Sequence, residues 1–341
     1  MQQEKISLAP DKISSPASRK NAPVFVIGCG RSGTTLLYHM LLSAGNFVVY
    51  RTESNVINLL EPRFGDLSIP RRQRALLDAW YGCRLGSLSG LKRSELEERI
   101  RAECKNGGDF LRIIMEEMAR KQGVERWADT TPEHLLYLER IKETIPDALI
   151  IHIIRDGRDV ALSTERQNYI RRLPWDRTPA TMVAGLYWEW MVNRGRRDGQ
   201  KLGHDYTEVH FEDLIERPQE TLARLGDFIE HDLDYERILQ VGIGSVRSPN
   251  TSFRDQSAEH FSPIGRWRAQ YSDHDLHMLE ALIGKTLVDL GYELAKDRDS
   301  NHRLNLGRMR TIYRTYFDAK LYLKAKTPLA RLLVTRDLSW I

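Results

Sequence analysis

The fold of this chain is decided by residues 24–35, which read VFVIGCGRSGTT. The first four residues, Val24–Ile27, are all apolar and predict a short strand buried in a parallel sheet. A helical pattern begins at Thr34 and continues to near Gly45. Glycines between the two elements allow the backbone to turn tightly and to approach a ligand closely. Since free N–H groups at the start of a helix attract anions, this segment predicts a phosphate-binding loop.

The loop differs at one position from the GxxxxGK[ST] pattern of nucleoside triphosphatases. That pattern places a lysine, which neutralises the β- and γ-phosphates, where this chain has Thr34. The positive charge here is carried by Arg31, three residues earlier, and Thr34 and Thr35 add hydroxyl donors. This arrangement argues against hydrolysis of a nucleoside triphosphate, and a P-loop kinase or NTPase is kept as the alternative enzyme class. The alternative without a ligand is a strand–helix turn whose glycines serve only packing.

A second distinctive segment, RDGRDVALS, covers residues 155–163. It follows ALIIHII at residues 148–154, the strongest strand pattern in the chain, in which His152 is expected to be a core residue. Arg155 therefore ends a strand and points into the crevice where α/β folds bind ligands. Ser163 lies about two helical turns further on. A guanidinium and a hydroxyl suit a phosphate monoester; the alternative is a salt-bridge turn between arginine and aspartate.

Strands and helices alternate along the rest of the domain. Further strands are predicted at residues 47–50, 126–128 and 208–211, and further helices at residues 133–144 and 218–229. This alternation predicts an α/β fold with a mostly parallel central sheet flanked by helices. Residues 1–22 are expected to form a flexible N-terminal arm. Residues 23–300 are expected to form one domain with a helical insertion near residues 60–122, and residues 301–341 a basic amphipathic tail.

Composition excludes several classes of protein. The 341 residues are 41% hydrophobic and 29% charged, as in an ordinary globular protein, and a net charge of +4 is too small to indicate a nucleic-acid partner. Cys29, Cys83 and Cys104 form no CxxC pair, so neither a disulfide framework nor a zinc site is expected. The N-terminus has no apolar core for a signal peptide. No stretch reaches the roughly 18 apolar residues that span a bilayer, and a cytoplasmic location is expected.

Taken together, the two anion-binding segments resemble the sulfotransferase family that uses 3′-phosphoadenosine 5′-phosphosulfate (PAPS). The likeness runs in order through residues 23–292 and implies the P-loop NTPase-like sulfotransferase fold. The resemblance implies that the first segment binds the 5′-phosphosulfate through Arg31, Ser32, Gly33, Thr34 and Thr35. It also implies that Arg155 and Ser163 bind the 3′-phosphate. PAPS is then the co-substrate, and no metal is expected because the sulfuryl group carries less charge than a phosphoryl group.

Three further segments are similar to the family. Residues 129–134, DTTPEH, precede the long strand as a similar segment does there. Phe211 stands where the family has the tyrosine of its YEDL segment, and its ring could flank the adenine. The resemblance implies that Gly265, Arg266 and Trp267 belong to a segment that closes over the cofactor.

Direct in-line transfer of a sulfuryl group to a hydroxyl or amine acceptor needs a base for the acceptor and positive charge at the leaving oxygen. Where the family commonly has lysine or histidine, this chain has Thr130. Glu53 follows the second predicted strand and is similar in position to the catalytic glutamate of sulfotransferases that act on tyrosine or sugar chains. It is therefore the expected base, with Asp129 and His134 in reserve, and Arg31 is expected to stabilise the leaving group. The alternative for Glu53 is an exposed loop acid paired with a neighbouring arginine.

The residues do not distinguish a carbohydrate, a lipid, a peptide tyrosine or a small natural product as the acceptor. Residues 302–341 contain nine Lys and Arg against two Asp, and apolar residues recur at helical spacing from Leu304 to Leu333. Such a helix could contact an anionic membrane peripherally, or it could pack its apolar face on the domain, which is the expectation. A catalytically inactive, membrane-peripheral scaffold is the alternative without enzyme activity.

Overall fold

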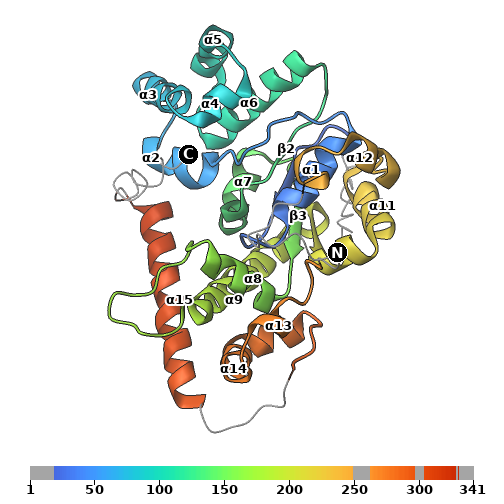
Figure 1. Cartoon of the computed structure of the whole chain (residues 1–341). Helices are drawn as coiled ribbons and strands as arrows, with labels where there is room; N and C mark the ends of the chain where they lie inside the picture. The colour runs from blue at the N-terminus through green and yellow to red at the C-terminus, as the bar shows by residue number, and fades with distance from the viewer. Residues whose placement is uncertain (1–18, 249–261, 296–302, 328, 330–341) are drawn as a thin grey trace, which may run out of the picture.

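The computed structural model describes residues 19–248, 262–295, 303–327 and 329. Its centre is a four-stranded, all-parallel sheet in the order β2-β1-β3-β4 (Figure 1). The strands are β1 (Val24–Ile27), β2 (Ala128–Asp129), β3 (Leu149–Ile154) and β4 (Tyr206–His210). Helices cover both faces of this sheet. The prediction of an α/β fold with a parallel, helix-flanked sheet is confirmed.

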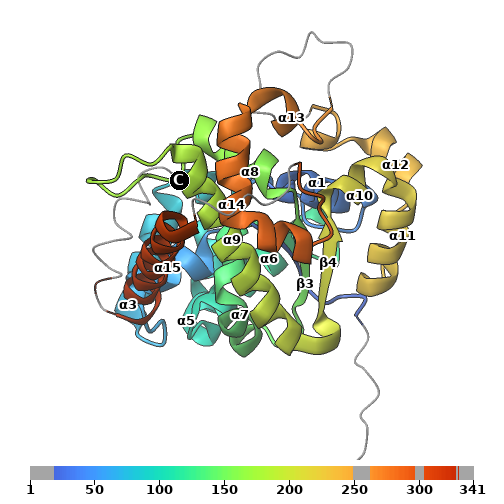
Figure 2. The same ribbon diagram turned by 90° about the horizontal axis from the view of Figure 1, so that it is seen from below.

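Side chains alternate along each strand, so the sheet buries two separate sets of residues. Val24 and Val26 point to one side of the sheet, and Phe25 and Ile27 to the other. The helices on the first side are α1 (Thr34–Ala44), α10 (Phe211–Glu216), α11 (Pro218–Ile229) and α12 (Tyr235–Val241). The helices on the second side are α7 (Leu138–Thr144), α8 (Gly157–Arg166), α9 (Ala180–Gly199) and α14 (Asp273–Asp289). Figure 2 shows both layers, with β3 and β4 between them.

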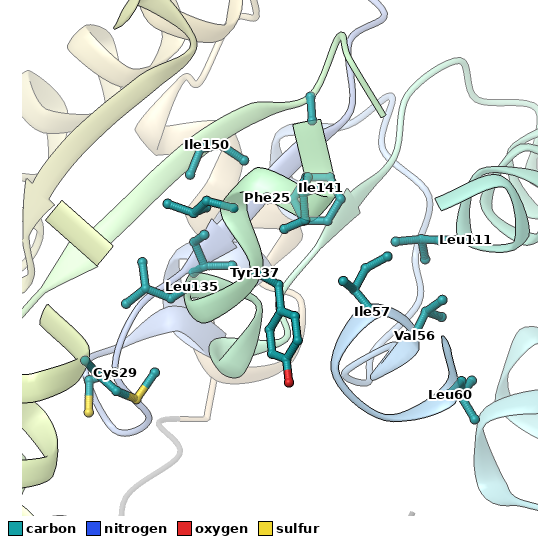
Figure 3. Close-up of a cluster of buried hydrophobic side chains, with 14 of the residues drawn as sticks. Phe25, Cys29, Val56, Ile57, Leu60, Leu111, Leu135, Tyr137, Ile141 and Ile150 are labelled. Carbon is teal, nitrogen blue, oxygen red and sulfur yellow. The ribbon is translucent and has the colours of Figure 1, made fainter. Parts of the chain in front are cut away.

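The chain between β1 and β2 contains an all-helical segment that gathers at one end of the molecule (Figure 1). Its elements are η1 (Val56–Leu60), α2 (Glu61–Phe64), α3 (Pro70–Tyr81), α4 (Arg84–Ser89), α5 (Arg93–Glu103) and α6 (Gly107–Gln122). Ile57 and Leu111 from this segment lie in the same cluster as Phe25 and Ile150 of the sheet (Figure 3). The helical segment therefore shares the main hydrophobic core instead of forming a core of its own.

Residues 47–50 do not form the predicted strand. Phe47 makes one isolated parallel bridge to Arg126. The pairing stops there because the backbone N–H and C=O of Val49 bond to the side chain of Gln122 (2.8 and 3.2 Å), which takes the place of a neighbouring strand. The Thr52 N–H then bonds to the carbonyl of Tyr50 (2.9 Å), and the chain turns away from the sheet.

The helix predicted at residues 133–144 is divided in two. Its first part is the 3₁₀ helix η2 (Pro132–Tyr137), and α7 follows. The His134 N–H bonds to the carbonyl of Thr131, three residues earlier (3.0 Å), as in a 3₁₀ turn. The His134 ring is also bonded to the carboxylate of Asp129 (2.8 Å), which holds this turn against the end of β2. Two other short 3₁₀ helices are η3 (Gln200–Asp205) and η4 (Gly244–Val246).

Part of the segment expected to form a flexible N-terminal arm contacts the domain. Residues 1–18 lie outside the described part of the chain, but residues 19–22 are bound to the domain. The guanidinium of the fully buried Arg126 donates to the carbonyls of Ala22 (2.8 Å) and Arg19 (2.9 Å). Arg19 donates in turn to the carbonyl of Phe228 (2.9 Å). These residues are held because a buried guanidinium needs acceptors, which their backbone supplies.

The tail begins as the long helix α15 (Arg303–Lys326), which packs against α9 and α14. Its buried side chains Tyr313, Phe317 and Leu321 belong to the main core. The expectation that this helix packs an apolar face on the domain is confirmed; residues 328 and 330–341 lie outside the described part. Among the described residues, no helix combines the length and apolarity that crossing a bilayer requires.

The contact between Gly157 and Trp188 gives a test of the packing. A Cβ added at Gly157 would lie 2.5 Å from the ring of the fully buried Trp188, whose Nε1 donates to the carbonyl of Arg155 (3.1 Å). Gly157→Ala is therefore expected to lower the free energy of unfolding by about 1–3 kcal/mol through overpacking, measured by urea denaturation. Gly307→Ala is the control, because a Cβ there has open space; it should stabilise by at most about 1 kcal/mol. Unchanged stability of Gly157→Ala would contradict the assigned contact.

Candidate active site

The carboxyl ends of all four strands meet at one edge of the sheet. β1 lies between β2 and β3, so the chain crosses over β1 when it passes from β2 to β3. Such a reversal leaves a crevice next to the central strand, where α/β folds bind ligands. The loop after β1, Asp129 at the end of β2, Arg155 after β3 and Phe211 after β4 all lie at this edge.

The loop after β1 needs glycine at two positions. A Cβ at Gly28 would lie 2.3 Å from the carbonyl oxygen of Ile153 in the neighbouring strand. Gly33 has a φ of 98°, and a Cβ there would lie 2.4 Å from the ring of Phe211. Arg31 has a positive φ of 72° without being glycine. Gly30 faces open space, which leaves room for a ligand to approach the backbone.

Several donors of this loop have no partner within the described part of the chain. They are the backbone N–H groups of Gly33, Thr34 and Thr35, at the start of α1, where no side chain caps the helix. The hydroxyl of Ser32 is fully buried and also lacks a partner among the described residues. Buried polar groups are nearly always hydrogen-bonded, so this set of donors fits an anion at the start of α1.

The two anion-binding segments predicted from sequence lie together. Arg31 Nε donates to Ser163 Oγ (3.0 Å), although 132 positions separate these residues. Arg155 Nη1 donates to the backbone carbonyl of Arg31 (3.0 Å). The structure therefore places the first loop, the end of β3 and the second turn of α8 in direct contact.

Arg155 lies beneath the loop, with an exposed fraction of 7%. Its Nη2 donates to the carbonyl of Pro263 (2.5 Å), and its guanidinium lies over the ring of Phe211, 4.5 Å from the ring centre. Its Nε is buried without a partner among the described residues. Burial lowers the pKa of Arg155, while Asp159 opposes this shift. Phe211 is itself buried, so its ring supports Arg155 and Gly33 from below.

Asp159 was not assigned a role from sequence, yet it holds the late segment in place. Its carboxylate accepts hydrogen bonds from the N–H groups of Gly265 (2.8 Å) and Trp267 (3.0 Å). It lies one helical turn after Arg155 and 3.8 Å from it, and this i,i+4 spacing is the signal that could have identified it. Trp267 is buried between the guanidinium groups of Arg158 and Arg268, so its ring packs under the turn.

Arg266 completes a group of cations at this edge. Burial and the positive charges of Arg155, Arg166 and Arg31 together lower its pKa to about 10, against the opposing effect of Asp159. Cations that repel one another in a partly desolvated place are stabilised when an anion binds between them. The predicted residues Arg31, Arg155, Ser163 and Arg266 are thus brought into one positively charged site.

The salt-bridge turn that sequence reasoning kept as an alternative exists beside this site. Arg158 is buried and donates to Asp156 (2.8 Å) and to Glu280 of α14 (2.6 Å). Burial disfavours its charged form, yet these two carboxylates outweigh that effect and raise the pKa of Arg158. In RDGRD, the Asp156–Arg158 pair is therefore structural, and Arg155 and Asp159 serve the site.

Glu53 lies beside the end of β2. Its side chain is exposed, as the alternative interpretation expected, but many protein atoms surround the carboxyl group and partly desolvate it. This desolvation and the nearby negative charges of Asp129 and Glu133 raise the pKa of Glu53 to about 7, although Asn55 opposes the shift. The alternative interpretation also required an ion pair between Glu53 and Arg51. No such ion pair is present within the described residues. A carboxylate with this pKa can accept a proton near neutral pH.

The two reserve bases, Asp129 and His134, are both engaged in hydrogen bonds within the protein. Asp129 is buried; it accepts from the Thr131 N–H (3.0 Å) and bonds to Nδ1 of His134 (2.8 Å). The Ile57 N–H donates to Nε2 of His134 (3.3 Å), so that nitrogen is the acceptor and Nδ1 carries the proton. Both residues therefore fix the turn next to Glu53. Thr130 is also buried, and its hydroxyl has no partner in the described part of the chain.

A cavity of about 1360 Å³ lies next to the site, between η1, α7, α9 and α15. Ile57, Tyr137 and Lys324 are among its lining residues, and the residues that line it include neither Arg31 nor Glu53. Lys324 donates to the carboxylate of Glu133 (3.1 Å). The described residues contain no group of three His, Cys, Asp or Glu side chains arranged to hold a metal ion.

Comparisons with known proteins identify similar folds and a matching family. A solved sulfotransferase domain from the curacin biosynthetic pathway has a TM-score of 0.52 at 16% identity, over 82% of this chain and 100% of that one. The sulfotransferase domain of the Synechococcus PCC 7002 olefin synthase has a TM-score of 0.49 at 18% identity, over 85% of this chain and 100% of that one. Mouse sulfotransferase SULT7A1, solved in complex with PAP, has a TM-score of 0.40 at 12% identity, over 88% of this chain and 90% of that one.

The first of these structures supports the fold, and the two lower scores add no argument. No curated protein sequence matches the chain. The family model described as the sulfotransferase family matches residues 23–235, which include the glycine loop, Glu53 and the whole RDGRDVALS segment. This match covers more than half of the chain, which therefore belongs to the sulfotransferase family.

Proposed function

We propose that this protein is a PAPS-dependent sulfotransferase with Glu53 as its base. The observation that carries the proposal is the convergence of Arg31, Arg155 and Arg266 on a loop with unpartnered N–H donors. A donor with phosphate groups at both its 5′ and 3′ ends needs two anion sites, one at the start of α1 and one near Ser163. The hydrogen bond between Arg31 and Ser163 supports this proposal, because it joins the two segments that would supply these sites.

In the proposed reaction, PAPS supplies the sulfuryl group. The acceptor oxygen forms a bond to sulfur, the bond from sulfur to the 5′-phosphate oxygen breaks, and 3′-phosphoadenosine 5′-phosphate (PAP) leaves. Glu53 takes the proton of the acceptor hydroxyl. The N–H groups of Gly33, Thr34 and Thr35, with Arg31, stabilise the charge that develops on the leaving phosphate. Arg155 and Ser163 hold the 3′-phosphate.

A P-loop kinase or NTPase is the less favoured alternative. Thr34 occupies the position of the lysine that such enzymes use at the β- and γ-phosphates, and its side chain is buried. No acceptor class is favoured by the contacts around Glu53, so a carbohydrate, lipid, tyrosine or small natural product remains equally suitable.

Ligand selectivity tests the proposal directly. PAP is expected to raise the melting temperature of the protein, whereas ATP and NAD without a 3′-phosphate should raise it less at equal concentration. The measurement is a thermal-shift titration, followed by transfer of radiolabelled sulfate from PAPS to fractions of a cell extract. A larger shift with ATP and magnesium than with PAP would favour the kinase alternative.

The 3′-phosphate contact can be tested with two variants. Ser163→Ala and Arg155→Ala each remove a hydrogen bond to a charged group, which is worth about 1.5–3 kcal/mol, so PAP affinity should fall roughly tenfold or more. Adenosine 5′-monophosphate lacks the 3′-phosphate, and its affinity should change much less. Calorimetric titration of both ligands measures the difference, and equal losses for the two ligands would contradict the assignment.

The pKa of Glu53 predicts the pH dependence of transfer. Because the base is active when deprotonated and its pKa is raised to about 7, kcat/KM should rise with pH and level off above about 7. Glu53→Gln should reduce transfer by about 100-fold or more, remove this pH dependence and leave PAP binding intact. Glu216→Gln, an exposed acid on α10, is the matched control. Full activity in Glu53→Gln would exclude Glu53 as the base.

A further inference from the structure

The helix α15 has two apolar faces, and only one of them is buried. Tyr313, Phe317 and Leu321 pack into the core. A second set, Ile312, Tyr316, Ala319 and Leu323, recurs at intervals of four, three and four residues and is exposed. This spacing puts the second set on a single stripe of the helix. The exposed fraction of Ile312 is 51% and that of Leu323 is 38%, so much of the outer stripe stays exposed, although the ring of Tyr316 contacts that of Phe317.

Cations and no acids border this outer stripe. Arg308, Lys320 and Lys326 are exposed, and none has a carboxylate within ion-pair distance in the described part of the protein. The one acid of α15, Asp318, accepts hydrogen bonds from Trp190 (2.9 Å) and Arg194 (3.3 Å) of α9. Its charge is therefore directed to the domain, and the outer surface of α15 is apolar and positive.

The loop of residues 167–179 extends this surface. It projects past α15 at the same edge of the molecule in both views (Figures 1 and 2). Tyr313 of α15 holds the loop by donating to Asp176 (2.5 Å) and accepting from the Leu173 N–H (3.2 Å). The loop exposes two aromatic side chains and three arginines: Tyr169, Trp175, Arg171, Arg172 and Arg177. The exposed fraction of Trp175 is 76%, an unusual value for tryptophan.

We infer that the outer stripe of α15 and the 167–179 loop together form a docking surface for an anionic membrane. Lipid headgroups of negative charge would pair with the cations, and the apolar stripe would enter the boundary between headgroups and acyl chains. Tryptophan and tyrosine favour that boundary because one part of the ring system is apolar and another is polar. A second copy of the chain is a poorer occupant, since a symmetric contact would place the same cations against each other.

Co-sedimentation of the full chain with vesicles tests this inference. The protein should bind vesicles of phosphatidylcholine and phosphatidylserine in equal parts, should not bind phosphatidylcholine alone, and should dissociate as salt increases. Each cation near an anionic surface contributes about fivefold to binding, so the triple variant Arg308→Gln, Lys320→Gln, Lys326→Gln should bind about 100-fold more weakly. Ile312→Ser with Leu323→Ser keeps the charge and should also weaken binding, because the apolar stripe is lost.

A charge-matched control separates this surface from net charge. The triple variant Arg71→Gln, Arg74→Gln, Arg101→Gln removes three cations from α3 and α5, and its vesicle binding should equal that of the unaltered protein. The thermal shift with PAP should be the same in all variants, so a folding defect would be detected. The inference is overturned if anionic vesicles are not bound, if both triple variants lose binding equally, or if the Ser variants bind fully. A dimer in analytical ultracentrifugation that Ile312→Asp dissociates would also overturn it, in favour of a second copy.

Discussion

The guanidinium group of Arg155 joins the segments on which the rest of the site depends. It donates to the carbonyls of Arg31 and Pro263 and lies over Phe211, so one buried cation connects the ends of three strands to the late turn. A buried charge is costly unless it is paired, and Asp159 is the carboxylate that pairs with it. Asp159 also binds the backbone of the late turn, which couples the position of that turn to the charge of Arg155.

Two regions of opposite electrostatic character lie side by side along the sheet edge. Burial and the neighbouring cations lower the pKa of Arg266, and the region favours an anion with more than one charge. Around Glu53, the carboxylates of Asp129 and Glu133 favour the protonated form. A group transfer from an anionic donor to a hydroxyl needs both, because the donor must be held and the acceptor must lose a proton.

Local patterns predicted the elements whose signal is complete within a few residues. The ALIIHII run and the glycine loop are of this kind, since a short apolar run between glycines is typical of a buried parallel strand. Predictions failed where a distant side chain decided the outcome. The strand at residues 47–50 is replaced because Gln122 takes its hydrogen bonds, and residues 19–22 are bound to the domain because Arg126 needs their carbonyl groups.

The sequence by itself determined the α/β class, the two segments whose pattern indicates anion binding, and the family, because each depends on residues that are close together in the chain. Only the tertiary structure decided that Arg31 meets Ser163, that Asp159 holds the late turn and that the pKa of Glu53 lies near 7. It also decided which apolar face of α15 is buried. Hydrogen bonds, desolvation and ion pairing depend on distances between segments that are far apart in the chain, and these distances exist only once the chain has folded.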